Sequence, residues 1–298
     1  MTMERVTNIF TVDLEDWFHA NYHGSPEKAV VSTVESNTSV LLDLLDRHET
    51  KATFFCLGQI AVSHPSLIKR IGAAGHEVAS HGQNHQLVYQ QTPAEFREDV
   101  LECKQRLEEI TGRAVLGYRA PSWSITAESL WALDVLESLG FAYDSSIFPM
   151  KTFLYGIQGA PRFPYRPSTP GASSRLVEIP PSTVAFLGKT MGFGGGFYLR
   201  SLPLFIQIMF SRSLNNSGRP FLIYIHPREI DPQQPRLKLT FKEHLIHYWG
   251  IRHTFRKLDN FLSNFSFAPM SGFLSGLKIS ELPLCNPSVV QKQDGGNR

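Results

Sequence analysis

Short apolar segments alternate with helical ones between residues 6 and 145, and this alternation is typical of a parallel α/β fold. The segments 6–12, 52–57, 76–80, 115–118 and 141–143 have the apolar character of buried strands. Helical spacing of apolar residues separates them, at 39–48, 65–74, 92–111 and 126–139. Strands connected in this way lie parallel to one another. The pattern therefore predicts a parallel sheet, open or closed into a barrel.

The alternation of strand and helix segments stops after residue 150. Repeated prolines and the glycine run 194–196 predict a loop-rich rim over 150–220, with FGGGFY as a flexible segment. An apolar strand is expected at 221–225 and one helix over 241–262. We therefore expect a barrel domain over 1–230, a helical extension over 231–275 and a disordered tail over 276–298.

Charge and cysteine content exclude several classes of protein. The chain has 29 Lys and Arg against 27 Asp and Glu, a net charge of +2 without a basic run, so we expect no nucleic-acid partner. Three cysteines without a CxxC motif predict reduced thiols rather than disulfides or a thiolate zinc cluster. No secretory signal or membrane-length apolar run is recognisable, so we expect a cytoplasmic location. The oligomeric state stays open.

Polar residues stand where several predicted strands end. They are Asp13, Glu15 and Asp16 after the first strand, His81 after the third, Arg119, Asp144, and His226 after FLIYI. Because the carboxyl ends of parallel strands meet at one edge of the sheet, these side chains are expected in one pocket. The alternative is that these residues are solvated at the strand ends. In that case we would not expect them to follow several apolar segments in turn.

Two histidines, His81 and His85 in SHGQNH, are candidate metal ligands. Imidazoles four positions apart can bind one divalent cation. The chain has 11 histidines, so such a pair alone also fits a solvated loop. The carboxylates of TVDLEDWF favour the metal site because they offer a third ligand.

Those carboxylates have different expected orientations. On an extended strand Asp13 and Glu15 face one side and Asp16 the other, unless the strand has already turned. One acid can bind the metal while a second takes a proton from water. A solvated strand end is again the alternative, which the neighbouring Trp17 and Phe18 disfavour.

Other charged residues have two interpretations each. Arg119 in YRAPSW either holds a carboxylate or is a surface cation. His226 is either a general acid or a core histidine. His247 and Lys257, with other basic residues on the predicted 241–262 helix, are expected on a solvated basic face.

The order of these motifs resembles carbohydrate esterase family 4, the polysaccharide deacetylases of the chitooligosaccharide-deacetylase type. The resemblance covers about residues 6–230 and is most specific in ATFFCLG and GHEVASHGQNH. It implies a distorted (β/α)7-type barrel and a divalent metal, usually Zn2+, that serves to hydrolyse N-acetyl groups of amino sugars. The C-terminal TFKEHLIHYWGIRHTFRKLDNFL resembles, more loosely, an extension found on deacetylases of bacterial exopolysaccharide loci.

The resemblance also implies roles for individual residues. His81 and His85 match the metal-binding histidines and Arg119 the arginine that orients the catalytic base. His226 matches the general acid, and Asp144 an aspartate that supports it.

The first motif departs from the usual two adjacent aspartates. It resembles the branch of peptidoglycan deacetylases and allantoinase-like amidases, where two acids are spaced by one residue. Asp13 is then the expected base, Glu15 the first choice of carboxylate ligand and Asp16 the second.

The leading hypothesis is a metal-dependent deacetylase that acts on an N-acetylated saccharide of a bacterial polysaccharide or its precursor. One alternative is an allantoinase-like cyclic amidase that works without metal on the same barrel. Another is a catalytically inactive saccharide-binding protein, which the joint presence of Asp13, His81, His85, Arg119 and His226 disfavours.

Overall fold

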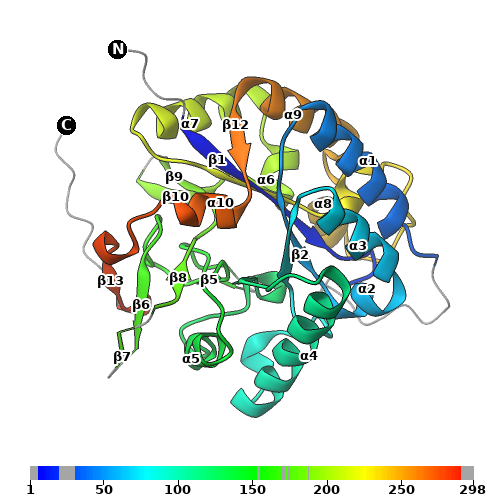
Figure 1. Cartoon of the computed structure of the whole chain (residues 1–298). Helices are drawn as coiled ribbons and strands as arrows, with labels where there is room; N and C mark the ends of the chain where they lie inside the picture. Colours follow the sequence, from blue (N-terminus) through cyan, green and yellow to red (C-terminus); the bar gives the residue numbers. More distant parts are fainter. Residues whose placement is uncertain are drawn as a thin grey trace.

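A curled parallel sheet forms the centre of the computed structural model, which describes residues 6–19, 31–152, 155–169, 172–173, 175–186 and 188–289. Its strands run in the order β11–β1–β2–β3–β4–β5–β8 (Figure 1). Their bounds are β1 (Thr7–Leu14), β2 (Thr53–Cys56), β3 (Glu77–Ser80), β4 (Gly117–Tyr118), β5 (Tyr143–Asp144), β8 (Val177–Glu178) and β11 (Leu222–Ile225). The predicted parallel sheet is confirmed.

Helices connect these strands and cover the outside of the sheet (Figure 1). They are α1 (Val34–Arg47), α2 (Gly58–Ser63), α3 (Pro65–Ala73), α4 (Pro93–Thr111) and α5 (Trp131–Ser138). A capping box begins α4, because Thr92 Oγ1 accepts from the Glu95 backbone N–H and Glu95 accepts from that of Thr92. Gly112 ends the helix with a φ of 66°.

The sheet buries both of its faces. Phe54 and Phe10 belong to the core between strands and helices. Their neighbours Phe55 and Ile9 belong to a second apolar cluster with Trp123. Successive strand residues point to opposite faces, so the second cluster fills the inside of the curled sheet. This explains why the strands are continuously apolar rather than alternating.

The segment 150–220 is more regular than the sequence predicted. It contains β6 (Arg166–Thr169), β7 (Ala172–Ser173), β9 (Thr183–Phe186), β10 (Lys189–Gly192), α6 (Gly196–Ser201) and α7 (Leu204–Asn216). The glycine run, expected to be flexible, packs against β11. A Cβ on Gly194 would lie 2.1 Å from Leu222 O, and one on Gly195 2.4 Å from Tyr224 O. These glycines therefore permit close contact between backbones.

The C-terminal part differs from the prediction in three ways. The single helix expected over 241–262 is two, α8 (Phe241–Tyr248) and α9 (Ile251–Asn264), separated by Gly250 with a φ of 78°. Strand β12 (Ser266–Ala268) pairs with the start of β1 and so belongs to the sheet. Residues 276–289, expected to be disordered, include η4 (Ile279–Glu281) and β13 (Leu284–Cys285), which follow α10 (Met270–Ser275). The QKQDGGNR end lies outside the described residues.

Two residues assigned to a solvated basic face are buried. His247 is 1% exposed and Lys257 is 9% exposed. The Lys257 ammonium donates to the carbonyl oxygens of Leu199, Arg200 and Leu202 at 2.8, 2.9 and 2.7 Å. The basic-face prediction is therefore wrong at these positions, because the unpaired carbonyls at the end of α6 supply acceptors that the sequence pattern does not show.

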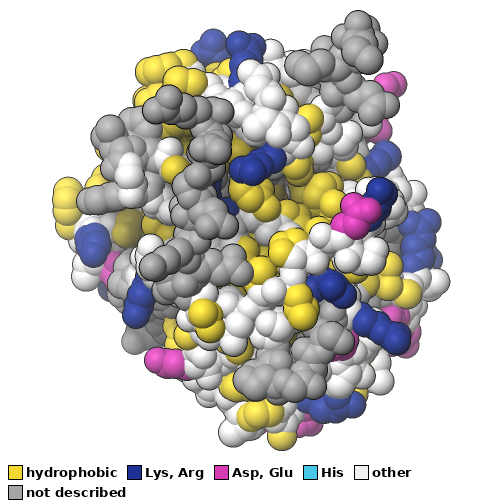
Figure 2. Space-filling view, turned by 90° about the vertical axis from the view of Figure 1, so that its left-hand side faces the viewer, with side chains coloured by type: hydrophobic (Ala, Val, Ile, Leu, Met, Phe, Trp, Pro, Cys, Tyr) yellow, Lys and Arg dark blue, Asp and Glu magenta, His cyan; other side chains and the backbone are white. Residues whose placement is uncertain are grey.

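The surface mixes charges. On the face shown in Figure 2, Lys and Arg side chains stand among Asp and Glu, around hydrophobic side chains near its middle. Among the side chains that are described there, no continuous basic stripe crosses this face. None of the described helices is long and apolar enough to cross a membrane.

Candidate active site

Four of the residues predicted at the strand ends, Asp13, Glu15, His81 and His226, line one cavity of about 460 Å³, whereas Asp16, Arg119 and Asp144 are not part of its wall. Its wall includes Asp13, Glu15, His81, His85, Trp123, Tyr224 and His226. Asp13 comes from β1, His81 directly follows β3 and His226 directly follows β11. The cavity therefore lies at the carboxyl edge of the parallel sheet, where such folds carry their sites.

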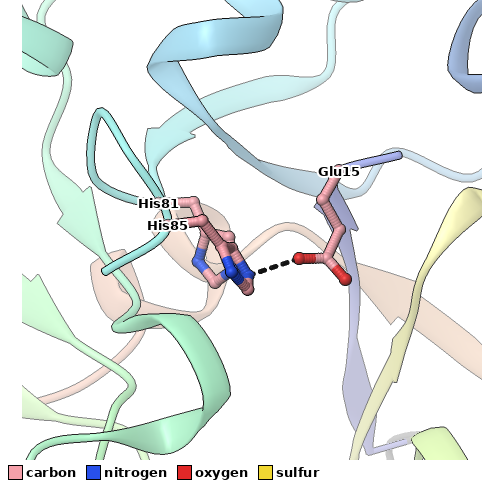
Figure 3. Close-up of side chains that lie close together, drawn as sticks. All are labelled: Glu15, His81 and His85. Carbon is pink, nitrogen blue, oxygen red and sulfur yellow. Dashed lines mark ion pairs between the residues drawn. The ribbon is translucent and has the colours of Figure 1, made fainter. Parts of the chain in front are cut away.

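Glu15, His81 and His85 form a candidate metal centre. Each offers one ligand atom, and these atoms lie within 4.8 Å of one another. Figure 3 shows Glu15 extending from the end of β1 toward the two imidazoles, which come from the loop after β3. Glu15 Oε2 lies 2.5 Å from His85 Nε2.

The chemistry of these three residues fits a divalent cation. All three are buried, and the Glu15 carboxylate is directed at the His85 imidazole, as two ligands of one ion would be. His81 Nδ1 lies 2.8 Å from the carbonyl oxygen of Arg119, which fixes the ring and leaves Nε2 for the metal. Two imidazoles and one carboxylate are a ligand set that zinc uses in catalytic sites.

Asp16, the second candidate for the carboxylate ligand, is used elsewhere. Its Oδ1 accepts from the backbone N–H groups of Trp17 and Thr33 at 2.9 and 3.2 Å. It holds the turn after β1 to the start of α1 and is not one of the clustered ligand atoms. The strand-parity argument that separated Glu15 from Asp16 agrees with this placement.

Asp99 of α4, which the sequence reasoning missed, shapes the loop between the two histidines. Its carboxylate accepts from the backbone N–H groups of Gln83 and Asn84 at 2.7 and 3.1 Å. The loop brings His85 into the left-handed region with a φ of 54°. Asp99 lies sixteen positions after Gln83 and on a different element, so no local sequence pattern indicates this contact.

Arg119 holds Asp13. Arg119 Nη1 donates to Asp13 Oδ1 at 2.6 Å and to Thr11 Oγ1 at 2.9 Å. Its guanidinium carbon lies 4.0 Å from the centre of the Phe55 ring and 4.6 Å from that of Trp123. Of the two interpretations given for Arg119, the structure agrees with the first: it is a buried guanidinium that holds a carboxylate, and not a surface cation.

His226 has carboxylates on two sides. Its Nε2 lies 3.6 Å from Glu15 Oε1 and 3.9 Å from Asp13 Oδ2. On its other side, Nδ1 lies 3.2 Å from Glu229 Oε2. Burial opposes a charge on His226, but Glu15 and Glu229 outweigh it and raise the pKa of the imidazole.

Glu229 takes the supporting position that we expected of Asp144. Arg200 of α6 donates to Glu229 Oε1 at 2.7 Å and orients it. Asp144 instead accepts a short hydrogen bond from Ser146 and lies beside Glu178. Burial raises the pKa of Asp144 to about 6, and burial together with the neighbouring Asp144 raises that of Glu178 well above its ordinary value. The expected role of Asp144 is therefore corrected.

The carboxylate of the candidate metal centre is charged. Burial would raise the pKa of Glu15, but the neighbouring His85 and His226 outweigh burial and bring it well below the ordinary value. Burial lowers the pKa of His81 to about 4, which keeps this imidazole neutral. A charged carboxylate and a neutral imidazole are the forms that bind a metal.

A curled parallel sheet that presents two histidines, a carboxylate and an acid–base pair at one edge is typical of metal-dependent hydrolases. Comparison with known proteins gives the family. Residues 24–143 match the polysaccharide deacetylase family, and residues 145–275 match a domain of unknown function, DUF3473. The match supports a polysaccharide deacetylase domain over residues 24–143, in agreement with the resemblance that the motif order indicated.

Two curated relatives are named deacetylases. A chitooligosaccharide deacetylase of Bradyrhizobium sp. is 35% identical over 100 residues, 33% of this chain and 43% of that protein. The peptidoglycan-N-acetylglucosamine deacetylase PgdA of Listeria monocytogenes is 33% identical over 165 residues, 52% of this chain and 32% of that protein. The chain thus spans less than half the length of these relatives.

Solved structures confirm the barrel fold. A polysaccharide deacetylase structure from Mycobacterium smegmatis superposes with a TM-score of 0.64 at 21% identity and covers 98% of this chain and 96% of its own. The PuuE allantoinase structure gives a TM-score of 0.56 at 15% identity and covers 96% of this chain and 89% of its own. The expected (β/α)7-type architecture is therefore correct.

Proposed function

We propose that this chain removes N-acetyl groups from amino sugars of a bacterial polysaccharide or its precursor, and that it does so with a divalent metal, Zn2+ first. One observation carries the proposal: a single cavity brings the Glu15–His81–His85 cluster together with Asp13 and His226. A hydrolysis of an unreactive amide needs a polarised carbonyl, a base and an acid at one point. These five side chains supply all three.

Each residue has a distinct part. Glu15, His81 and His85 would hold the cation, which when bound polarises the acetamide carbonyl and lowers the pKa of water. Asp13 accepts the proton of the attacking water through Oδ2, since Arg119 occupies Oδ1. Buried between Phe55 and Trp123, Arg119 keeps Asp13 in one orientation throughout.

His226 delivers the proton to the departing amine. Its raised pKa favours the protonated form near neutral pH, which a general acid requires. Glu229 stabilises that form at Nδ1 and leaves Nε2 directed toward Asp13 and Glu15. The general acid His226 therefore lies on the same side of the cavity as the base Asp13, next to the amide bond that is hydrolysed.

The proposal is tested by acetate release from N-acetylglucosamine oligosaccharides. Protein stripped by a chelator and reloaded with Zn2+ should turn over, and the stripped protein should not. Allantoin serves as the competing substrate. Hydrolysis of allantoin by the stripped protein, with no acetate release after reloading, would support the cyclic amidase instead. Intact saccharide binding without any turnover would support the inactive binding protein.

The cellular context belongs to the same proposal. A cytoplasmic role in exopolysaccharide synthesis is supported by Cys56 and Cys103, which are buried and form no disulfide. Cell fractionation and the acetylation state of the polysaccharide in a deletion strain test it. A periplasmic location, or an unchanged acetyl content, would contradict this part of the proposal alone.

A further inference from the structure

Arg228 is a buried cation that the proposed mechanism does not use. It lies in η3 (Pro227–Ile230), two residues after His226, and forms part of the cavity wall. Arg228 is only 6% exposed. The cavity therefore has a guanidinium in its wall, close to the general acid.

The other two arginines of the site are each paired with a carboxylate, and Arg228 is not. Arg119 pairs with Asp13 and Arg200 with Glu229. Among the described residues, no carboxylate oxygen lies within 4.0 Å of Arg228. Its Nη1 approaches His247 Nε2 at 3.2 Å and His247 O at 3.5 Å, and its Nε has no hydrogen-bond partner in the described part of the chain.

His247 does not neutralise this charge. Burial, together with Arg228 and Arg200, lowers the pKa of His247 to about 2, so the ring is neutral. Glu229 is the acid nearest to Arg228 in sequence, but its carboxylate contacts Arg200 and His226. Among the residues that the structure describes, the guanidinium of Arg228 thus has no carboxylate in direct contact, and Glu229 acts on its charge only at longer range.

A buried charge is costly unless it is paired, and an arginine in a cavity wall can be paired by a ligand. The guanidinium matches carboxylate and phosphate groups in shape and charge. Neutral sugars need no such partner, because hydroxyl groups are satisfied by uncharged donors and acceptors. The unpaired arginine is therefore a feature that favours an anionic ligand.

We propose that Arg228 binds an anionic group of the saccharide, a uronate carboxylate or a phosphate, on a sugar next to the one whose acetamide reaches His226. This inference rests on the proposed deacetylation and adds a specificity to it. Lys151, exposed on the wall of the same cavity, provides a second positive charge for such a group. The enzyme then selects acidic polysaccharides or phosphorylated precursors over neutral chitin-like chains.

The test compares three N-acetylglucosamine oligosaccharides of equal length, using Zn2+-loaded protein. One is neutral, one carries a glucuronic acid next to the N-acetylated sugar, and one carries a phosphate ester there. The wild type should have a KM lower by about tenfold or more for one of the charged substrates, the usual effect of a charge-assisted hydrogen bond. Which charged substrate is preferred distinguishes carboxylate from phosphate.

Variants assign this preference to the residue. Arg228→Gln should raise the KM of the preferred anionic substrate about tenfold or more, with little change in kcat or in the neutral substrate. Arg228→Lys should keep part of the preference. Arg252→Gln, an exposed arginine outside this cavity, is the matched control and should change neither.

Equal KM values for the three substrates would overturn the inference while leaving the deacetylase activity standing. So would an Arg228→Gln protein that loses melting temperature and slows on all three alike, because Arg228 would then only brace α8 through His247. Absence of turnover on any substrate would defeat the proposed function. In that case calorimetric binding of glucuronate and inorganic phosphate decides: loss of binding in Arg228→Gln supports the anionic site, and equal binding contradicts it.

Discussion

Arg119 Nη1 lies 2.6 Å from Asp13 Oδ1, and the Phe55 and Trp123 rings pack against the Arg119 guanidinium. Arg119 is 0% exposed, so water does not compete for this contact. The second oxygen of Asp13 is left facing His226 at 3.9 Å. One ion pair thereby decides which oxygen of the expected base can accept a proton.

Asp13→Asn should abolish turnover while metal content stays near that of the wild type. The amide keeps an oxygen for Arg119 but cannot accept a proton as a carboxylate does. We expect a loss of about 10²–10⁴-fold in kcat, the usual contribution of positioned proton transfer. Acetate release and zinc per chain measure the two effects. Loss of the metal in this variant would show that Asp13 is a ligand and not the base.

Glu15→Gln and Asp16→Asn form a matched pair. Glu15 is clustered with His81 and His85, whereas the Asp16 carboxylate accepts from the backbone of Trp17 and Thr33. Glu15→Gln should weaken zinc binding about tenfold or more, and Asp16→Asn should leave it close to the wild type. Competition with a fluorescent chelator measures both affinities. The opposite order would assign the carboxylate ligand to Asp16.

Glu229→Gln should lower kcat on amides more than on esters. Glu229 stabilises protonated His226, and an amine leaving group needs that proton more than an alkoxide does. We expect about 10–100-fold on an N-acetyl substrate with a smaller loss on an O-acetyl one. Asp144→Asn is the control, because this buried acid contacts Ser146 rather than His226. The assignment fails if Asp144→Asn changes the amide-to-ester ratio and Glu229→Gln does not.

Stability should decrease in mild acid, partly through His76. Burial lowers the pKa of His76 from 6.5 to about 4, and its Nδ1 accepts from the Ala52 N–H at 3.1 Å. Between pH 6.5 and about 4 the unfolded chain takes up a proton that the folded chain does not, so the free energy of unfolding falls as pH falls. The decrease is at most about 1.4 kcal/mol for each pH unit.

His76→Asn keeps an acceptor for Ala52 but cannot be protonated in this range. Its free energy of unfolding should therefore depend less on pH than that of the wild type, when both are measured by denaturant titration between pH 7 and 5. Identical slopes for the two proteins would contradict the lowered pKa. Chelated protein is used for both, so that release of metal does not enter the comparison.

The sequence predicted the β1–β5 part of the sheet well because local signals and the fold agree there. The capping box at Thr92 and the αL glycine at Gly112 are short-range features, and both are present. His81 and His85 were found because each follows a strand within the same loop. Asp13 and Glu15 were separated from Asp16 by the two-residue period of a strand.

The rest depended on contacts between distant residues. Glu229 supports His226 only because Arg200, on another helix, turns its carboxylate. Lys257 looked like a solvated cation, yet carbonyls nearly sixty positions earlier bind it. The glycine run looked flexible because its partner, the β11 backbone, is not visible in local composition.

Strand β1 obtains its neighbours from both ends of the chain. Its first residues pair with Ser266–Ala268 of β12, its middle and end with β11, and its end also with β2. During synthesis from the first residue, β1 therefore waits for more than two hundred further residues before its hydrogen bonds are complete. A ribosome-stalled chain ending before residue 222 could pair β1 with β2 but not with β11. It would leave one edge of this apolar strand open to chaperones and to aggregation.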